Sequence, residues 1–284
     1  MIPATDEGLS NTDLLAIATE EMQSYVMSLL LSVREEYRVA DYDLTVVAGT
    51  STYRMPERAA GDKARDVLLL VGSDYVPLTR IEPERRAMSS ATGSVEGFMF
   101  QDTDLVLVPT PAQSGTVRIK YFRRPSKLVA TSAVATIATI ASDRLSVTTS
   151  STIPSTFTTS AALDFVDNNP GFRLHQMDLT PTVASGTGLT FATALPSSIS
   201  AGDYVCLAGE SPVPMCPVEV HPLLCQRTAQ VAMEALSDPR AGAAEAKCDR
   251  MKKDALALLT PRSEGSARYL INFNGPGWQR RRGR

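Results

Sequence analysis

The four cysteines and two histidines are the side chains best suited to metal binding or nucleophilic chemistry. They are Cys206, Cys216, Cys225, Cys248, His175 and His221. No two cysteines form a CxxC pair, and neither histidine stands near a cysteine at the spacing of metal ligands. We therefore expect free thiols in a reducing cytoplasm, with no zinc site and no other cofactor.

Other catalytic patterns are equally incomplete. Residues 60–63 (AGDK) resemble a phosphate loop, but the flanking glycine and the Ser/Thr after the lysine are missing. His221 precedes a proline at an expected helix start, which favours capping or packing. His175 has Asp178 nearby but no Gly-x-Ser-x-Gly motif to serve. Nothing selects a pair of carboxylates, so we predict that the chain is not an enzyme.

Charge separates the end of the chain from the rest. Residues 262–284 contain six Arg and one Glu, a net charge of +5, so the preceding 261 residues carry −8 of the total of −3. An acidic body with a basic tail gives no overall case for nucleic-acid binding. Residues 1–10 are polar with two acids, so no signal peptide is expected. The apolar stretch near residues 26–33 is too short to span a membrane, and no membrane insertion is expected.

Three segments have the apolar spacing of amphipathic helices: residues 13–38, 218–237 and 243–260. Asn11 or Thr12 is the expected N-cap of the first. Its stripe includes Leu15, Met22 and Val26. A short link between the last two predicts antiparallel neighbours that pack with the first segment. Residues 81–88 are also typical of a helix, with Pro83 in its first turn.

Between these helices, apolar residues recur at every second position instead of every third or fourth. Val117, Ile119 and Tyr121 alternate with polar residues, as do Val106 and Val108, which predicts half-buried strands. Residues 102–104 (DTD) suit a hairpin turn between two apolar runs. Residues 67–71 are predicted to form a buried strand. Residues 128–211 differ in being rich in Ser and Thr, with short strand patterns separated by turn signals.

We therefore predict an α+β fold: a helical bundle formed by both chain ends, with a β body and an inserted β-sandwich-like module. The expected parts are an N-terminal helical part, the β body, the Ser/Thr-rich β module, a C-terminal helical hairpin packing with the first part, and a basic tail. Their respective boundaries are 1–40, 41–127, 128–211, 212–261 and 262–284.

Three segments of the β body resemble a known family. They are residues 56–67 (PERAAGDKARDV), residues 97–100 with 105–109 (GFMF and LVLVP), and residues 121–125 (YFRRP). These segments resemble head–tail connector adaptor proteins of tailed bacteriophages. The resemblance implies a structural protein of the virion neck that is assembled in the host cytoplasm. It also implies a ring of about twelve copies, with the portal protein on one side and the tail nozzle or tail-completion protein on the other. Double-stranded DNA would pass through the lumen, and an acidic wall would let it slide.

Two other classes remain open. A tail-fibre or receptor-binding protein would use the Ser/Thr-rich β region to bind glycans. A virion-associated wall hydrolase would need a catalytic site that the sequence does not reveal.

The basic tail is the predicted portal-docking element, because it has too few apolar residues to fold alone. Trp278 is the chain's only tryptophan and the expected anchor. The full set of expected docking residues is Tyr269, Leu270, Ile271, Phe273, Trp278, Arg280, Arg281, Arg282 and Arg284. Arginine pairs bidentately with carboxylates, which suits an acidic portal surface. The alternative is a basic tail that touches DNA.

Overall fold

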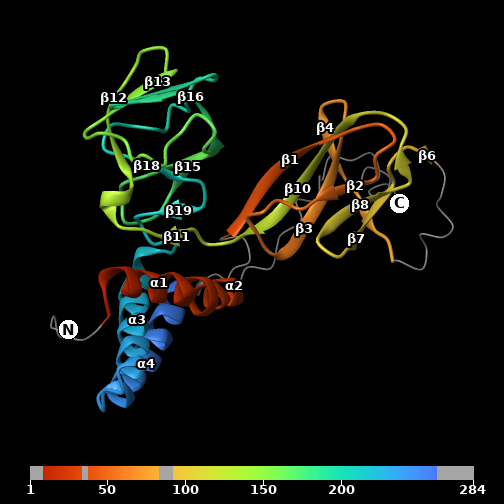
Figure 1. Cartoon of the computed structure of the whole chain (residues 1–284). Coiled ribbons are helices and arrows are strands. Elements are labelled where there is room, and N and C mark those ends of the chain that lie inside the picture. Colours follow the sequence, from red (N-terminus) through yellow and green to blue (C-terminus); the bar gives the residue numbers. More distant parts are fainter. Residues whose placement is uncertain (1–8, 34–37, 83–91, 261–284) are drawn as a thin grey trace, which may run out of the picture.

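The computed structural model describes residues 9–33, 38–82 and 92–260 (Figure 1). The chain is a mixed α+β structure in which helices, a β body and a second β module extend from a common junction. The expected helix at residues 81–88 and the basic tail at residues 262–284 lie wholly or mostly outside the described residues. No helix of the described part is long and apolar enough to cross a membrane.

The first helical segment is continuous but changes type along its length. It consists of α1 (Asn11–Glu21), the π-helical turn η1 (Met22–Val26) and α2 (Met27–Val33). Ser10 caps it, rather than the expected Asn11 or Thr12. The Ser10 hydroxyl accepts a hydrogen bond from the Asp13 amide at 3.2 Å, and the Ser10 amide donates to the Asp13 carboxylate at 2.9 Å. This reciprocal box satisfies two donors at the helix start, so it outcompetes a single cap further along.

The later helices pack against the first. The short η5 (Val218–Val220) leads into α3 (His221–Ala235), which packs on both α1 and α4 (Ala241–Leu259). Their shared core consists of Met22, Val26, Leu29, Leu30, Leu128, Met215, Cys216, Val220, Leu223, Leu224, Ala255 and Leu259. A bundle made by the chain ends themselves is not supported, because residues 1–8 and 261–284 lie outside the described residues. The helices that pack here are segments inside those ends.

The β body consists of two four-stranded sheets and a short pair. One sheet has the order β1-β10-β3-β4, the second β2-β8-β7-β5, and the pair is β6-β9. The strands are β1 (Val39–Val46), β2 (Thr52–Arg54), β3 (Ala59–Val71), β4 (Asp74–Pro77), β5 (Thr79–Arg80), β6 (Thr92–Gly93), β7 (Gly97–Gln101), β8 (Asp104–Val108), β9 (Thr110–Pro111) and β10 (Gly115–Arg123). One core cluster draws on both larger sheets, so the sheets face each other.

Several predictions for the β body are confirmed. Val117, Ile119 and Tyr121 of β10 are buried and alternate with more exposed neighbours. The β7–β8 hairpin turns at Asp102, whose φ of 56° is the left-handed conformation of a tight turn. The prediction that β8 is half-buried is wrong, because all residues from Leu105 to Val108 are buried. One face joins the main core, while Val106 and Val108 form a second cluster with Met99.

Two element boundaries differ from the sequence expectation because of strand pairing. Strand β1 begins at Val39, inside the N-terminal part (residues 1–40) expected to be helical, since Val39 pairs with Phe122 of β10. Strand β3 spans Ala59–Val71, so the predicted strand at residues 67–71 is only its second half. Its first half pairs with the end of β10 through two register shifts, which periodicity alone does not reveal.

The second β module is one seven-stranded sheet of order β15-β14-β18-β12-β13-β17-β16. Its strands are β12 (Ala135–Ile140), β13 (Ser146–Thr149), β14 (Leu163–Val166), β15 (Leu174–Leu179), β16 (Pro181–Ser185), β17 (Gly188–Phe191) and β18 (Tyr204–Leu207). Both halves contribute to one core, so the sheet folds over on itself at β12, where the pairing with β13 has a register shift. The expected sandwich is therefore a single bent sheet rather than two separate ones.

The chain enters and leaves this module side by side. Strand β11 (Lys127–Leu128) pairs in parallel with β19 (Glu210–Ser211), and the 3-10 turn η4 (Thr131–Ala133) follows β11. Leu128 donates its amide to the Thr19 hydroxyl of α1 at 3.0 Å. The paired links therefore rest on the helices, and the module begins and ends at the junction of all three parts (Figure 1).

Candidate functional site

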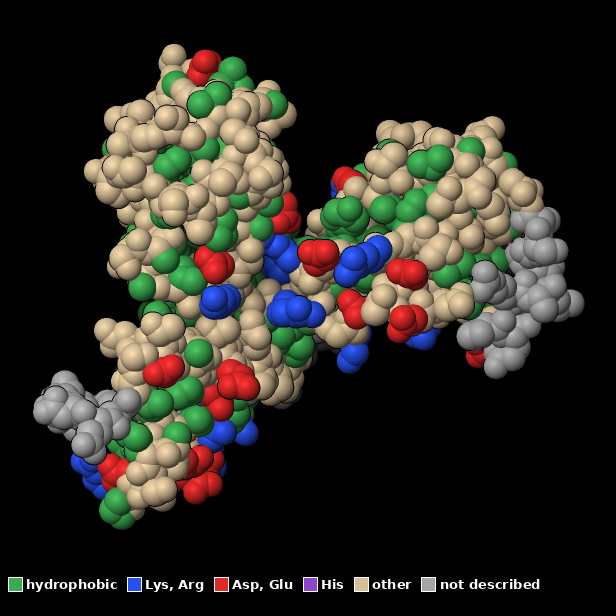
Figure 2. Space-filling view, in the orientation of Figure 1, with side chains coloured by type: hydrophobic (Ala, Val, Ile, Leu, Met, Phe, Trp, Pro, Cys, Tyr) green, Lys and Arg blue, Asp and Glu red, His purple; other side chains and the backbone are tan. Residues whose placement is uncertain are grey.

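Arginine side chains gather where the helices, the β body and the module meet. Figure 2 shows Lys and Arg at this junction and along the helices, whereas the upper part of the module is mainly apolar and uncharged polar. Arg58 precedes β3, Arg123 ends β10 and Arg38 precedes β1. The ends of three neighbouring strands thus bring these guanidinium groups to one region.

Arg58 links the β body to the module. Its Nη2 lies 2.8 Å from Asp164 Oδ2 on β14 and 2.9 Å from Asp178 Oδ1 on β15. Asp164 is fully buried, and its carboxylate also accepts the amides of Asp178 at 3.0 Å and Gly209 at 3.1 Å. Burial raises the pKa of Asp178, and the charge of Arg58 opposes that shift. This contact is a structural lock, because its charges are already paired.

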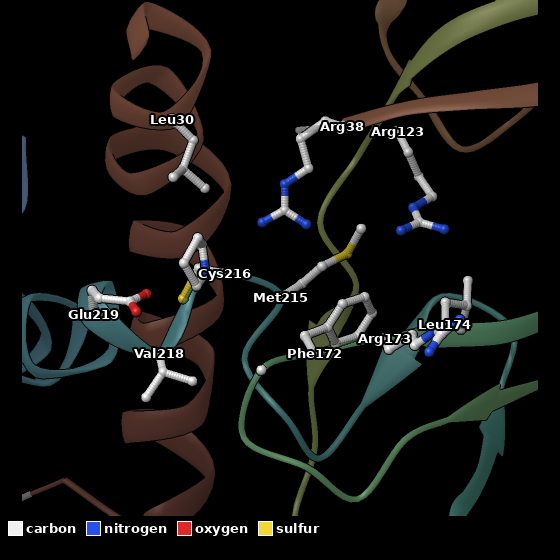
Figure 3. Close-up of a pocket in the computed structure, with 12 residues that line it drawn as sticks. Leu30, Arg38, Arg123, Phe172, Arg173, Leu174, Met215, Cys216, Val218 and Glu219 are labelled. Atoms are coloured by element: carbon white, nitrogen blue, oxygen red, sulfur yellow. The ribbon is translucent and has the colours of Figure 1, made fainter. Parts of the chain in front are cut away.

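Arg38 and Arg123 line a pocket of about 520 Å³ beside the connector that leads into α3. Figure 3 shows the guanidinium groups of Arg38 and Arg123 directed into the space above Met215 and Phe172. Leu30 of α2 forms the helical wall, and the exposed Arg173 stands on the β14–β15 loop. The pocket is therefore shared by all three parts of the chain.

Arg38 and Arg123 lack an anionic partner in the described part of the chain. Arg38 is only 5% exposed, and among the described residues the Nε atoms of both arginines have no hydrogen-bond partner. Arg123 donates to Met177 Sδ at 3.4 Å and lies 6.0 Å from the centre of the Phe172 ring. Among the described residues, neither arginine forms an ion pair with Glu219, the one acid that lines the pocket.

The electrostatics of the pocket favour an incoming anion. Burial lowers the pKa of Arg38 to about 10, and the nearby charge of Arg123 acts in the same direction. Burial likewise lowers the pKa of Arg123. Two desolvated cations without a counterion are costly, and a planar guanidinium holds a carboxylate or phosphate through paired hydrogen bonds. The pocket can therefore receive one acidic group, whereas the two guanidinium groups offer no nucleophile or general base.

The residues weighed for catalysis do not assemble. Cys206, Cys216 and Cys248 are buried and Cys225 is exposed, and all four are free thiols. Burial raises the pKa of Cys216 to about 12, so this thiol stays protonated and unreactive at neutral pH. His221, expected to cap a helix or to pack, has its Nε2 3.1 Å from the Cys216 carbonyl oxygen, within hydrogen-bond distance.

The remaining motifs considered in the sequence also lack the arrangement of an active site. Residues 60–63 lie within strand β3 and not in a loop before a helix, so they do not cradle a phosphate. Asp178 pairs with Arg58, while His175 instead faces Asp167 and Asp203. Sequence reasoning missed the arginine pocket and this last cluster, because their members are far apart in the chain. All the expected docking residues, from Tyr269 to Arg284, lie outside the described residues.

Comparison with known proteins identifies one similarity. The family model of the SU10 adaptor protein matches residues 9–146, slightly less than half of the chain. The match runs from α1 to the strands at the start of the module and includes Arg38, Arg58 and Arg123. No curated protein sequence matches the chain. The similarity suggests a structural adaptor protein of a phage virion, which fits the expectation that the chain is not an enzyme.

Proposed function

We propose that this chain is the subunit of an adaptor ring in the neck of a tailed phage, joining the portal protein to the tail. The observation that carries the proposal is the adaptor match over residues 9–146. It includes the segments at 56–67, 97–109 and 121–125, on which the resemblance to head–tail connectors rests. In the ring, the acidic body would contribute to a lumen through which double-stranded DNA slides without being held.

The first experiment is electron microscopy of the purified chain and of virions labelled with an antibody against it. We expect closed rings in solution and label at the neck. Label on distal fibres would support the receptor-binding alternative instead. Zymography on cell-wall substrate tests the hydrolase alternative, and a clear lysis band would overturn the assignment as a purely structural protein.

We assign the arginine pocket to contact between neighbouring subunits of the ring. A ring needs a heterologous interface, in which one surface of each copy receives a different surface of the next. The residues before the tail carry −8, so a second copy offers many carboxylates to Arg38 and Arg123. Pairing with one of them would supply the counterion that both guanidinium groups lack within the described chain.

Substitutions that remove the positive charge of the two arginines test this contact. The double variant Arg38→Gln and Arg123→Gln should stay folded but should form fewer rings, measured by size-exclusion chromatography with light scattering. Lys247→Gln on the exposed face of α4 is the control and should assemble as the wild type does. Unchanged ring formation by the double variant would refute the role of the pocket while leaving the adaptor assignment in place.

We also propose that residues 262–284 form the portal-docking element, with Trp278 as its anchor and Arg280, Arg281, Arg282 and Arg284 pairing with acidic portal residues. Docking through an aromatic anchor should survive moderate salt, whereas binding of DNA by the tail should weaken steeply with salt. We expect Trp278→Ala to reduce portal binding more than removal of the last five residues does. If a chain lacking residues 262–284 binds portal rings as well as the full chain, the docking role is wrong.

A further inference from the structure

Three strand ends of the module bring a histidine and two aspartates together. Strand β14 is flanked by β15 and β18, with Val166 opposite both Leu174 and Tyr204. Asp167 follows Val166, His175 follows Leu174 and Asp203 precedes Tyr204. The register of the sheet therefore places all three side chains at one end of neighbouring strands, although they are distant in sequence.

The distances within this cluster are too long for hydrogen bonds. His175 Nε2 lies 3.5 Å from Asp203 Oδ2 and 3.8 Å from Asp167 Oδ2. Hydrogen bonds from N–H to O usually measure about 2.7–3.2 Å. In contrast, ligand atoms about 2.1 Å from a tetrahedral zinc ion lie about 3.4 Å from each other. One potential ligand atom from each of the three residues lies within 4.8 Å of the others.

The cluster is also buried without a compensating cation. The exposed fractions of the side chains are 4% for His175, 2% for Asp203 and 16% for Asp167. In the described chain, the only basic residue within ion-pair distance of either aspartate is His175, and its Nδ1 has no hydrogen-bond partner. Buried carboxylates need a counterion or a metal. A nearly enclosed imidazole whose Nε2 faces two such carboxylates therefore points to a bound cation.

Neighbouring groups hold the carboxylates in place. Asp203 accepts the Ser200 amide at 2.7 Å and the Ser200 hydroxyl at 3.2 Å. Asp167 uses Oδ1 to accept the amide and side chain of Asn169 at 2.9 and 2.8 Å. This leaves Asp167 Oδ2, which faces His175, free to bind an ion. Such supporting hydrogen bonds orient the ligands of known metal sites.

We propose that Asp167, His175 and Asp203 bind one Zn²⁺ ion that stabilises the module. Imidazole nitrogen suits zinc better than it suits calcium or magnesium, which prefer oxygen ligands. Three protein ligands leave the fourth tetrahedral position to water. The ion joins the ends of β14, β15 and β18, and it fixes the start of the loop that carries Phe172 and Arg173 into the arginine pocket. Its role is structural and does not depend on the proposed adaptor function.

Zinc content of the full-length chain is the direct test. After removal of metal with a chelator and reconstitution with Zn²⁺, elemental analysis should find about one zinc per chain, as expected for one site. His175→Gln should lose this zinc, whereas His221→Gln, which changes the chain's only other histidine, should keep it. A stoichiometry near zero in the wild type, or equal zinc in both variants, would overturn the proposal.

A second measurement covers the possibility that His175→Gln does not fold. Asp167 is the most exposed member of the cluster, so Asp167→Asn should fold and bind zinc at least about tenfold more weakly, as loss of a ligand predicts. Removal of zinc should lower the melting temperature of the wild type and of His221→Gln by more than it lowers that of Asp167→Asn. An equal decrease in all three proteins, or none in the wild type, would show that the cluster holds no stabilising metal.

Discussion

Arg58→Met tests the lock between the β body and the module. Methionine keeps much of the length of the arginine side chain but removes its charge. Asp164 would then remain fully buried, with the amides of Asp178 and Gly209 as donors but with no cation of the described chain at ion-pair distance. Leaving one member of a buried ion pair without its partner typically costs about 3–5 kcal/mol. The hydrogen bonds from the two amides do not replace the lost charge.

The assay is urea unfolding of wild type and variant, followed by circular dichroism. A loss of about 3 kcal/mol would also lower the melting temperature by roughly 6 °C or more in a chain of this size. Asp178→Asn is the control within the same contact, because the Asp178 side chain is 54% exposed and should contribute less than about 1 kcal/mol.

A double variant separates the charge effect from simple loss of packing. Adding Asp164→Asn to Arg58→Met removes the uncompensated charge and keeps an acceptor oxygen for one of the two backbone amides. The double variant should therefore recover part of the stability lost by Arg58→Met. If Arg58→Met costs less than about 1 kcal/mol, or if the double variant is less stable still, the lock does not act through burial of a charged pair.

Arg38→Met should raise the melting temperature of the separate subunit while weakening ring formation, because it removes a buried charge that has no partner within the described chain. Val26→Asp should cost more than about 2 kcal/mol in urea unfolding, since Val26 is fully buried in the helical core; an unchanged melting temperature would argue against this packing. We propose that the module at residues 128–211 is separable. Replacing the part between β11 and β19, residues 130–209, with a short Gly/Ser linker should preserve the helical circular dichroism, whose complete loss would show that the module is integral. Arg118 holds the pKa of Asp43 below its usual 3.8, so the stability from this pair is present above pH 3.8 and is lost as pH falls through the lower folded-state pKa. Acid titration of Asp43→Asn should show a smaller loss of stability in that range than the wild type, and identical curves would refute the contribution.

Local patterns identified much of the secondary structure. The alternation of Val117, Ile119 and Tyr121 predicted β10, and the Asp102 turn predicted the β7–β8 hairpin. The stripe at residues 243–260 predicted a helix close to the observed α4 (Ala241–Leu259). These signals are contained in a few consecutive residues, because side-chain periodicity and turn conformation depend on neighbours in the chain.

Only the tertiary structure brought the candidate sites together. Arg58, just before β3, forms an ion pair with Asp164 on β14 of the module. Arg38 and Arg123 line one pocket because β1 pairs with β10. Nothing near Arg38 in the sequence marks it as a buried cation, since surface arginines occur in the same local patterns. Burial and charge pairing depend on which distant segments pack together, so the sequence alone could not show them.

The module shows the same contrast between local sequence signals and placement by the tertiary structure. Turn signals and short apolar runs in residues 128–211 predicted strands, but they could not give the strand order or the bend at β12. His175 was therefore associated in sequence with Asp178, three residues away, whereas the sheet places it beside Asp167 and Asp203. Residue types and spacing determined the strands and helices of this protein. The order of the strands in the sheets decided which charged side chains share a site, because strand pairing joins residues that the chain itself keeps apart.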